Sequence, residues 1–171
     1  RNDDIMMYLD VGTNGELVIG TADWLMTCAC SAGPAFEGSG IEHGMRACYG
    51  AIERVVLRDS GEAVNYQTIG GVAPAGICGS ALIELVGELL HAGIIDRAGR
   101  FDSFAEHKRL VEISRGRLGY IVAWAEETAS GKDIFISERD IQDIIRAKAA
   151  IYSAMKLLLG KVGLGFDEVG S

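Results

Sequence analysis

The sequence predicts an α/β domain in which a mixed sheet packs against two helices. Residues 5–9 and 17–19 form two short apolar runs, which are typical of β-strands. Apolar side chains between residues 82 and 90 recur at the spacing of one helical face, and a similar spacing runs from 137 to 159. A chain of 171 residues is about one domain long, so we expect a single domain over residues 1–171.

The predicted strands follow one another in the first half of the chain. Residues 5–9 read as a strand buried on both faces, and Asn14-Gly15 predicts a hairpin to residues 17–19 because both residues tolerate positive φ. Residues 24–26 are expected to add a third strand. Residues 51–57 are expected to form either a strand or a short helix. Residues 64–69 and 120–124 are expected to form further strands.

Loops and helices complete the expected order. Residues 28–50 are rich in Gly, Ala and Ser and predict ordered loops whose backbone approaches its neighbours closely. Ser80 is the expected N-cap of a helix over 81–90, and Gly93 its C′ residue. Residues 137–140 resemble a capping box, which predicts a helix to residue 159. Residues 168–169 look like the start of another strand.

The charge balance and the apolar runs exclude several classes of function. Sixteen basic and 24 acidic residues give a net charge of −8, which argues against nucleic-acid binding. No apolar run approaches the roughly 20 residues that a membrane span requires. The first residues lack the pattern of a signal peptide, so we expect a cytoplasmic protein with no membrane partner.

The four cysteines do not have the paired Cys-x-x-Cys spacing of zinc sites. A Cys28–Cys30 pair could bind metal or act in redox chemistry. We favour reduced, partly buried thiols beside small residues. The other two are Cys48 and Cys78.

The turn after the first strand is the most informative stretch for chemistry. Asp10 at the end of a strand could hold Mg²⁺ or its bound waters, and Glu16 could reach the same metal or an attacking water. Backbone amides of the intervening residues could accept phosphate oxygens; these residues are Gly12, Thr13, Asn14 and Gly15. The alternative is a plain hairpin with two solvated carboxylates.

A second candidate lies where residues 76–80 open a helix. Gly76, Gly79 and Ser80 would place unpaired N–H groups near a phosphate, but these residues alone favour the alternative, a simple strand-to-helix connection. Glu37 is a lone carboxylate in a glycine-rich loop. The three histidines are too scattered for a metal site; they are His43, His91 and His107.

Taken in order, six motifs resemble the C-terminal ATPase region of reductive activators of corrinoid proteins. The resemblance runs over almost the whole chain, and the Gly-Pro-Ala-Phe-Glu-Gly block at 33–38 is specific to this family. The motifs are LDVGTNGE at 9–16, SAGPAFEG at 31–38, GMRA at 44–47, GAIE at 50–53, GICGS at 76–80 and AKAAI at 147–151.

These activators belong to the acetate and sugar kinase/Hsp70/actin superfamily, and the resemblance implies an RNase H-like lobe with a mixed sheet and packed helices. In this superfamily ATP lies between two such lobes. The resemblance implies that Asp10 belongs to the second phosphate loop and orients Mg²⁺, with Gly12 to Gly15 on the phosphates. The first phosphate loop is then expected upstream and the adenosine loop beyond residue 168. We therefore expect a truncated second lobe that is inactive alone.

The resemblance also implies partners for the intact protein. An iron–sulfur domain outside this chain, with a [2Fe-2S] or [4Fe-4S] cluster, would supply the electrons that return a Co(II) corrinoid protein of a methyltransferase system to Co(I). A homodimer is possible. The alternatives are a lobe of a dehydratase activator or small-molecule kinase, and a non-catalytic dimerisation or docking lobe.

Overall fold

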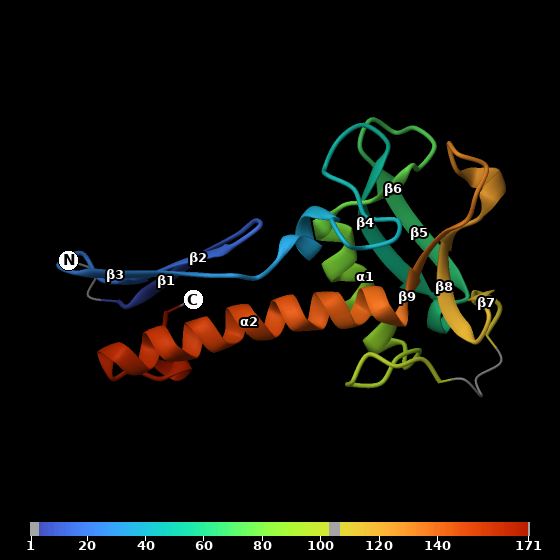
Figure 1. Cartoon of the computed structure of the whole chain (residues 1–171). Coiled ribbons are helices and arrows are strands. Elements are labelled where there is room, and N and C mark those ends of the chain that lie inside the picture. Colours follow the sequence, from blue (N-terminus) through green and yellow to red (C-terminus); the bar gives the residue numbers. More distant parts are fainter. Residues whose placement is uncertain (1–3, 103–106, 171) are drawn as a thin grey trace. The chain divides into compact units, whose positions relative to one another are not determined.

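The computed structural model describes residues 4–102 and 107–170. Its contacts divide the chain into two compact units. The described residues up to Pro34 form the first unit together with those from Arg146 onward, and residues 35–145 form the second. The long helix α2 (Glu138–Val162) contributes to both units (Figure 1).

The first unit is a three-stranded antiparallel sheet with the second half of α2 on one face. Its strands are β1 (Met6–Val11), β2 (Gly15–Gly20) and β3 (Leu25–Cys30), in the order β1-β2-β3. Leu17 and Ile19 on the central strand are fully buried and form a cluster with Leu158 and Leu159 of α2. The apolar face of this amphipathic helix thus covers one face of the sheet.

The predicted hairpin is confirmed, but its turn differs from the expected one. Val11 pairs with Gly15, so the loop comprises the three residues between them rather than an Asn14-Gly15 turn. Within the described residues, positive φ outside glycine occurs only at Asp59 and Ser60, and Gly15 is not among the positive-φ glycines. The hairpin therefore closes without positive φ at Asn14 or Gly15.

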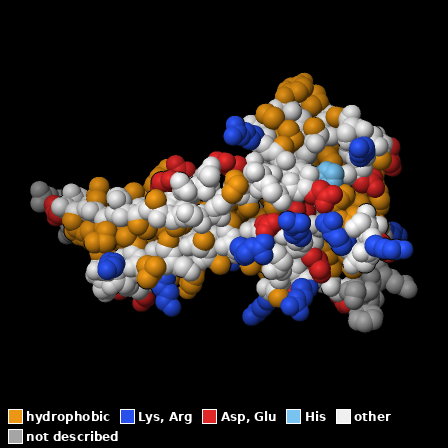
Figure 2. Space-filling view, viewed as in Figure 1, with side chains coloured by type: hydrophobic (Ala, Val, Ile, Leu, Met, Phe, Trp, Pro, Cys, Tyr) orange, Lys and Arg blue, Asp and Glu red, His pale blue; other side chains and the backbone are white. Residues whose placement is uncertain are grey.

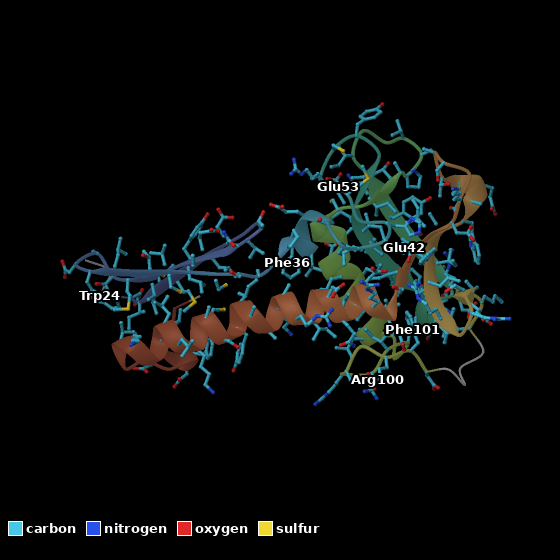
Figure 3. All side chains as sticks on the ribbon, in the orientation of Figure 1. Trp24, Phe36, Glu42, Glu53, Arg100 and Phe101 are labelled. Atoms are coloured by element: carbon cyan, nitrogen blue, oxygen red, sulfur yellow. The ribbon has the colours of Figure 1, made fainter. Side chains whose placement is uncertain are left out.

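Strand β1 also corrects a prediction about burial. It is an edge strand of the sheet and most of its residues are exposed, so it is not buried on both faces. Met6 is 54% exposed and Tyr8 64% exposed. Figure 2 shows hydrophobic side chains at the surface of this unit, and Trp24 lies in the connection between β2 and β3 (Figure 3).

The second unit contains two three-stranded sheets and the helix α1 (Gly79–His91). The strands of this unit are β4 (Ala51–Arg58), β5 (Ala63–Thr68), β6 (Gly76–Ile77), β7 (Leu110–Ser114), β8 (Arg117–Ala123) and β9 (Ile134–Ser137). The first sheet has the order β5-β4-β6, with β4–β6 parallel, and the second has the antiparallel order β7-β8-β9. Leu82, Leu85 and Leu89 are fully buried on α1, which packs against β4.

The helix caps were predicted with mixed success. The N-cap of α1 is Cys78 rather than Ser80, whose hydroxyl instead donates to the carbonyl of Glu53. Gly93 has φ of 74° just beyond the helix, which confirms the C′ prediction. The capping box before α2 is confirmed, because the Ser137 amide donates to the Asp140 carboxylate and the Asp140 amide donates to the Ser137 hydroxyl.

Three smaller predictions also need correction. Residues 28–30 belong to β3 and not to the loop region, since they continue the pairing with β2. Helix α2 passes through Gly160 and ends at Val162. The predicted strand start at 168–169 is a short 3₁₀ helix, Phe166–Glu168. Residues 51–57 are resolved as a strand.

In residues 4–102 and 107–170, the structure has no helix both long enough and apolar enough to cross a membrane.

Candidate functional site

Asp10 and Glu16 lie directly opposite each other across the β1–β2 hairpin. Their Cα atoms are register partners, one pair before the loop closes. Opposed residues of an antiparallel pair point to the same face of the sheet. Both side chains are exposed, and Glu16 also pairs with the small residue Ala29 on β3. The fold therefore brings together the two carboxylates that the sequence singled out.

This carboxylate pair fits a hard cation. Like charges directly opposite each other destabilise a strand pair. In the described part of the chain, the ion pairs formed by basic side chains involve neither Asp10 nor Glu16. Mg²⁺ prefers one or two carboxylates and keeps several waters. An exposed pair beside open solvent offers these ligands and leaves room for the waters.

The loop between the two carboxylates is short and internally bonded. The amide of Gly12 donates to the carbonyl of Asn14 at 2.8 Å, so this amide is already used inside the loop. A phosphate contact from Gly12 would therefore require that bond to open. Thr13 sits at the loop tip and has an interaction of its own.

Gly15 closes the loop for a reason of space. It is buried, and a Cβ at this position would lie 2.8 Å from Sγ of Cys30 and 3.3 Å from Cγ1 of Ile151. Contacts of that length force the neighbours to move, and the Ile151 side chain belongs to a packed helix face. A side chain at this position would therefore require the Cys30 and Ile151 side chains to shift.

The second predicted group lies in the other unit. Gly76 and Gly79 are packing glycines: a Cβ at Gly76 would lie 2.8 Å from the carbonyl oxygen of His43, and one at Gly79 would collide with that of Phe36. Phe36 lies in the 3₁₀ helix Pro34–Glu37 (Figure 3). Ser80 is exposed at the first turn of α1, where Cys78 provides no side-chain cap. Close packing therefore explains why both positions are glycine.

The remaining candidates have structural surroundings. Glu37 ends the 3₁₀ helix and has an interaction partner. His91 lies in the last turn of α1. His107 contacts the carbonyl of Ser60 and faces Glu62. Within the described residues, no three His, Cys, Asp or Glu side chains gather as a metal-binding group.

Two features were missed by the sequence reasoning. His43 packs edge-on against Phe135, its buried Nε2 has no hydrogen-bond partner, and burial lowers the pKa of its imidazole. Cys28 and Cys30 line a groove between β3 and α2. The alternation of residues 26, 28 and 30 along a strand was the signal that could have found this groove.

The fold and the hairpin together define an α/β lobe that presents a candidate cation site at its first turn. A family model described as the C-terminal domain of RACo, the ASKHA domain, matches residues 4–171. The chain belongs to this family, whose superfamily binds ATP.

Named relatives agree with this assignment. The chain is 34% identical to "Corrinoid activation enzyme RamQ" of Eubacterium limosum over 170 residues, and 26% identical over 186 residues to "[Co(II) methylated amine-specific corrinoid protein] reductase" of Methanosarcina barkeri. These alignments cover 96% and 95% of the chain but only 28% and 30% of the relatives.

A solved structure is also similar. It is named "Reductive activator for corrinoid,iron-sulfur protein", with a TM-score of 0.91 and 53% identity. The match covers 98% of this chain and 27% of that one. The α/β fold class and the superfamily expected from the motifs are confirmed.

Proposed function

We propose that this chain is the second lobe of the ATPase region of a reductive activator, which returns a corrinoid protein from Co(II) to Co(I). The observation that carries the proposal is the opposed Asp10–Glu16 pair in a chain that matches the ASKHA family over residues 4–171. The names of the relatives support corrinoid activation as the activity of the longer protein.

The hairpin would act as a rigid holder for the cation of a nucleotide complex. Asp10 and Glu16 project from paired strands, and the central strand is anchored by the buried Leu17 and Ile19. Bound Mg²⁺ would neutralise charge on the phosphate oxygens. The carboxylates orient this ion, and the Thr13 and Asn14 amides are the loop groups we assign to the phosphates.

The start of α1 is a second proposed anion contact. Gly79 and Ser80 occupy its first turn, where the positive end of the helix dipole and the amide groups favour an anion. The lack of a side-chain cap from Cys78 supports this role. Gly76 would contribute to this anion contact indirectly, because its close packing against the backbone of His43 fixes the chain that leads into α1.

We further propose the partners of the intact protein. Electrons would come from an iron–sulfur domain outside this chain, and the electron acceptor would be the corrinoid protein of a methyltransferase system in the cytoplasm. Lobe closure on ATP would change how the corrinoid protein docks. The intact activator would form a homodimer.

The test uses the full-length protein with its corrinoid partner. Asp10→Ala and Glu16→Gln should each lower ATPase activity and ATP-dependent Co(I) formation by at least about tenfold, since each removes a ligand of the cation. Asp23→Ala is the matched control, because this acidic residue lies in the β2–β3 connection of the same unit. The Mg²⁺ dependence of the ATPase activity distinguishes the loss of a cation ligand, which shifts this dependence, from misfolding, which lowers activity at every Mg²⁺ concentration.

Two results would contradict the proposed function. If Asp10→Ala keeps the ATPase rate and the Mg²⁺ dependence of the wild type, the hairpin does not hold the cation. If ATPase activity does not respond to the corrinoid protein at all, corrinoid activation is the wrong activity for this member of the family.

A further inference from the structure

A row of sulfur side chains runs along the inner face of β3. Met26, Cys28 and Cys30 are alternate residues of the strand and therefore project to the same side. Their register partners on β2 are Ile19, Leu17 and Gly15. Two of these partners belong to the buried cluster under α2, so the sulfur row faces the helix.

The row opens into a groove instead of being fully enclosed. Cys28 and Cys30 are half-buried, and all three sulfur side chains line a groove of about 560 Å³ between β3 and α2. The helix side of the groove is mostly small or apolar, with one basic side chain. These helix residues are Ala150, Ser153, Ala154, Leu157, Leu158 and Lys161. A small solute therefore has access to both thiols.

The two thiols are alternate neighbours on one face of the strand, and this spacing is unsuited to a disulfide. Alternate Cα atoms of an extended strand lie about 6.6–6.8 Å apart, at the upper limit of disulfide geometry, and their Cβ atoms point in parallel. Both cysteines are free. Both thiols lie on the same face of β3 and line the same groove.

An ion that bridges the two sulfur atoms tolerates this spacing better than a covalent bond. Thiolate and thioether ligands select soft ions such as Cu(I), and Met26 supplies a thioether on the same face. Binding of one Cu(I) by two thiols releases two protons and leaves one net negative charge on the complex. Lys161 lines the same groove and can offset that charge.

The site is connected to the hairpin loop through a direct contact. Cys30 is the register partner of Gly15, and its Sγ occupies the space beside Gly15 that a side chain would need. Ile151 closes the other side. A change in the position of the Cys30 sulfur therefore acts on the residue that ends the Gly12–Asn14 loop.

We propose that Cys28 and Cys30 form a two-thiolate site for a soft, thiophilic cation, and that occupancy of this site changes nucleotide affinity through Gly15. The second half of the proposal rests on the proposed function, because it needs the loop at residues 12–14 to contact phosphate. The first half stands on the geometry of β3 and α2 alone.

The experiment measures cysteine alkylation in the full-length protein with and without buffered Cu(I), under anaerobic conditions, with each cysteine followed by peptide mapping. Saturating Cu(I) should slow alkylation of Cys28 and Cys30 by at least about tenfold, because the coordinated thiolate is no longer free to react. Cys48, which is exposed in the second unit, is the internal control and should react at an unchanged rate.

Single substitutions test whether the two sulfur atoms act together. Cys28→Ser and Cys28→Ala should each weaken Cu(I) protection of Cys30 by at least about tenfold, and Cys48→Ser should leave it intact. The alanine variant keeps the groove apolar, so agreement between the two Cys28 variants excludes an effect of the hydroxyl. Equal alkylation rates with and without Cu(I), or protection of Cys30 that survives both Cys28 variants, would overturn the site.

The coupling has its own measurement. Loading with Cu(I) should lower the ATP affinity of the wild-type protein severalfold and leave that of the Cys28→Ala/Cys30→Ala double variant unchanged. Unchanged ATP affinity in the loaded wild type would overturn the coupling but not the site. The thiolate site does not depend on nucleotide binding if Asp10→Ala abolishes ATP binding while Cu(I) still protects Cys28 and Cys30.

Discussion

Strands β1 and β8 have similar apolar sequences but very different surroundings. β1 (Met6–Val11) is the edge of the first-unit sheet, and most of its side chains are exposed. β8 (Arg117–Ala123) lies between β7 and β9, and its residues from Gly119 to Ala123 are buried. An apolar run thus indicates a strand, whereas its burial depends on whether other elements cover both of its faces.

The same contrast appears in two carboxylates. Asp10 is exposed, and in the described structure it has no ion-pair partner. Asp140 is 2% exposed and accepts hydrogen bonds from Ser137 and from the amide of Glu42. One carboxylate is left available for a ligand, while the other is used to join a loop to the start of α2.

The largest loss of stability is expected for a substitution in the core of the second unit. Ile121→Ala, at a residue 1% exposed on β8, should lower the free energy of unfolding by about 2–5 kcal/mol, because it leaves a cavity in a packed interior. Met6→Ala on β1 should change it by less than about 0.5 kcal/mol. Urea unfolding, with hydrogen exchange of each strand followed separately, compares the two. Equal costs would mean that β1 is covered in solution.

The second largest difference in stability is expected between variants of the two carboxylates, Asp140 and Asp10. Asp140→Ala leaves the donors at Ser137 and Glu42 without an acceptor and should cost about 1–3 kcal/mol. Asp10→Ala should leave thermal stability almost unchanged, because it also removes a like-charge contact with Glu16. A comparison of thermal unfolding midpoints checks both expectations. A large loss in Asp10→Ala would assign that residue to folding.

A smaller difference in the free energy of unfolding is expected between variants of two tyrosines, Tyr120 and Tyr8. The Tyr120 hydroxyl is buried on β8 and donates to the carbonyl of Gly61 at 2.6 Å, and burial raises the pKa of this phenol. Tyr120→Phe should cost about 0.5–1.5 kcal/mol through the lost hydrogen bond. Tyr8→Phe, on exposed β1, should be neutral. Chemical denaturation of both variants would contradict this ranking if Tyr8→Phe proved the more harmful.

The smallest effect is a pH dependence of the second unit. Burial lowers the pKa of His43 below its ordinary value, although the nearby Glu42, Asp140 and Asp133 act in the opposite direction. The unfolded chain then binds more protons than the folded one, so stability rises with pH and is lost as pH falls below about 6.5.

His43→Leu tests this dependence. The variant should lose that part of the pH slope, measured as the change in unfolding midpoint between acidic and neutral buffer. His91→Ala, at an exposed position in the last turn of α1, should retain it. A wild-type midpoint that does not fall on acidification would contradict the lowered pKa of His43.

Much of the fold could be predicted because its signals are local. The helical spacing of residues 82–90 and the Ser137–Asp140 capping box depend on neighbours three or four residues apart, and both are confirmed. The hairpin also follows from adjacent residues, and it places Asp10 opposite Glu16. The roles of Gly76 and Gly79 in packing could not be predicted, since their neighbours His43 and Phe36 are distant in sequence.

The sequence by itself determined the family, the α/β class, the helices and the β1–β2 hairpin, because motif order, periodicity and capping are written in short stretches of chain. Only the tertiary structure decided which apolar strand is buried, that Gly15 packs closely beside Cys30, and that Cys28 and Cys30 share a groove with α2. These features arise from contacts between residues far apart in the chain, and their energies depend on packing that no single segment specifies.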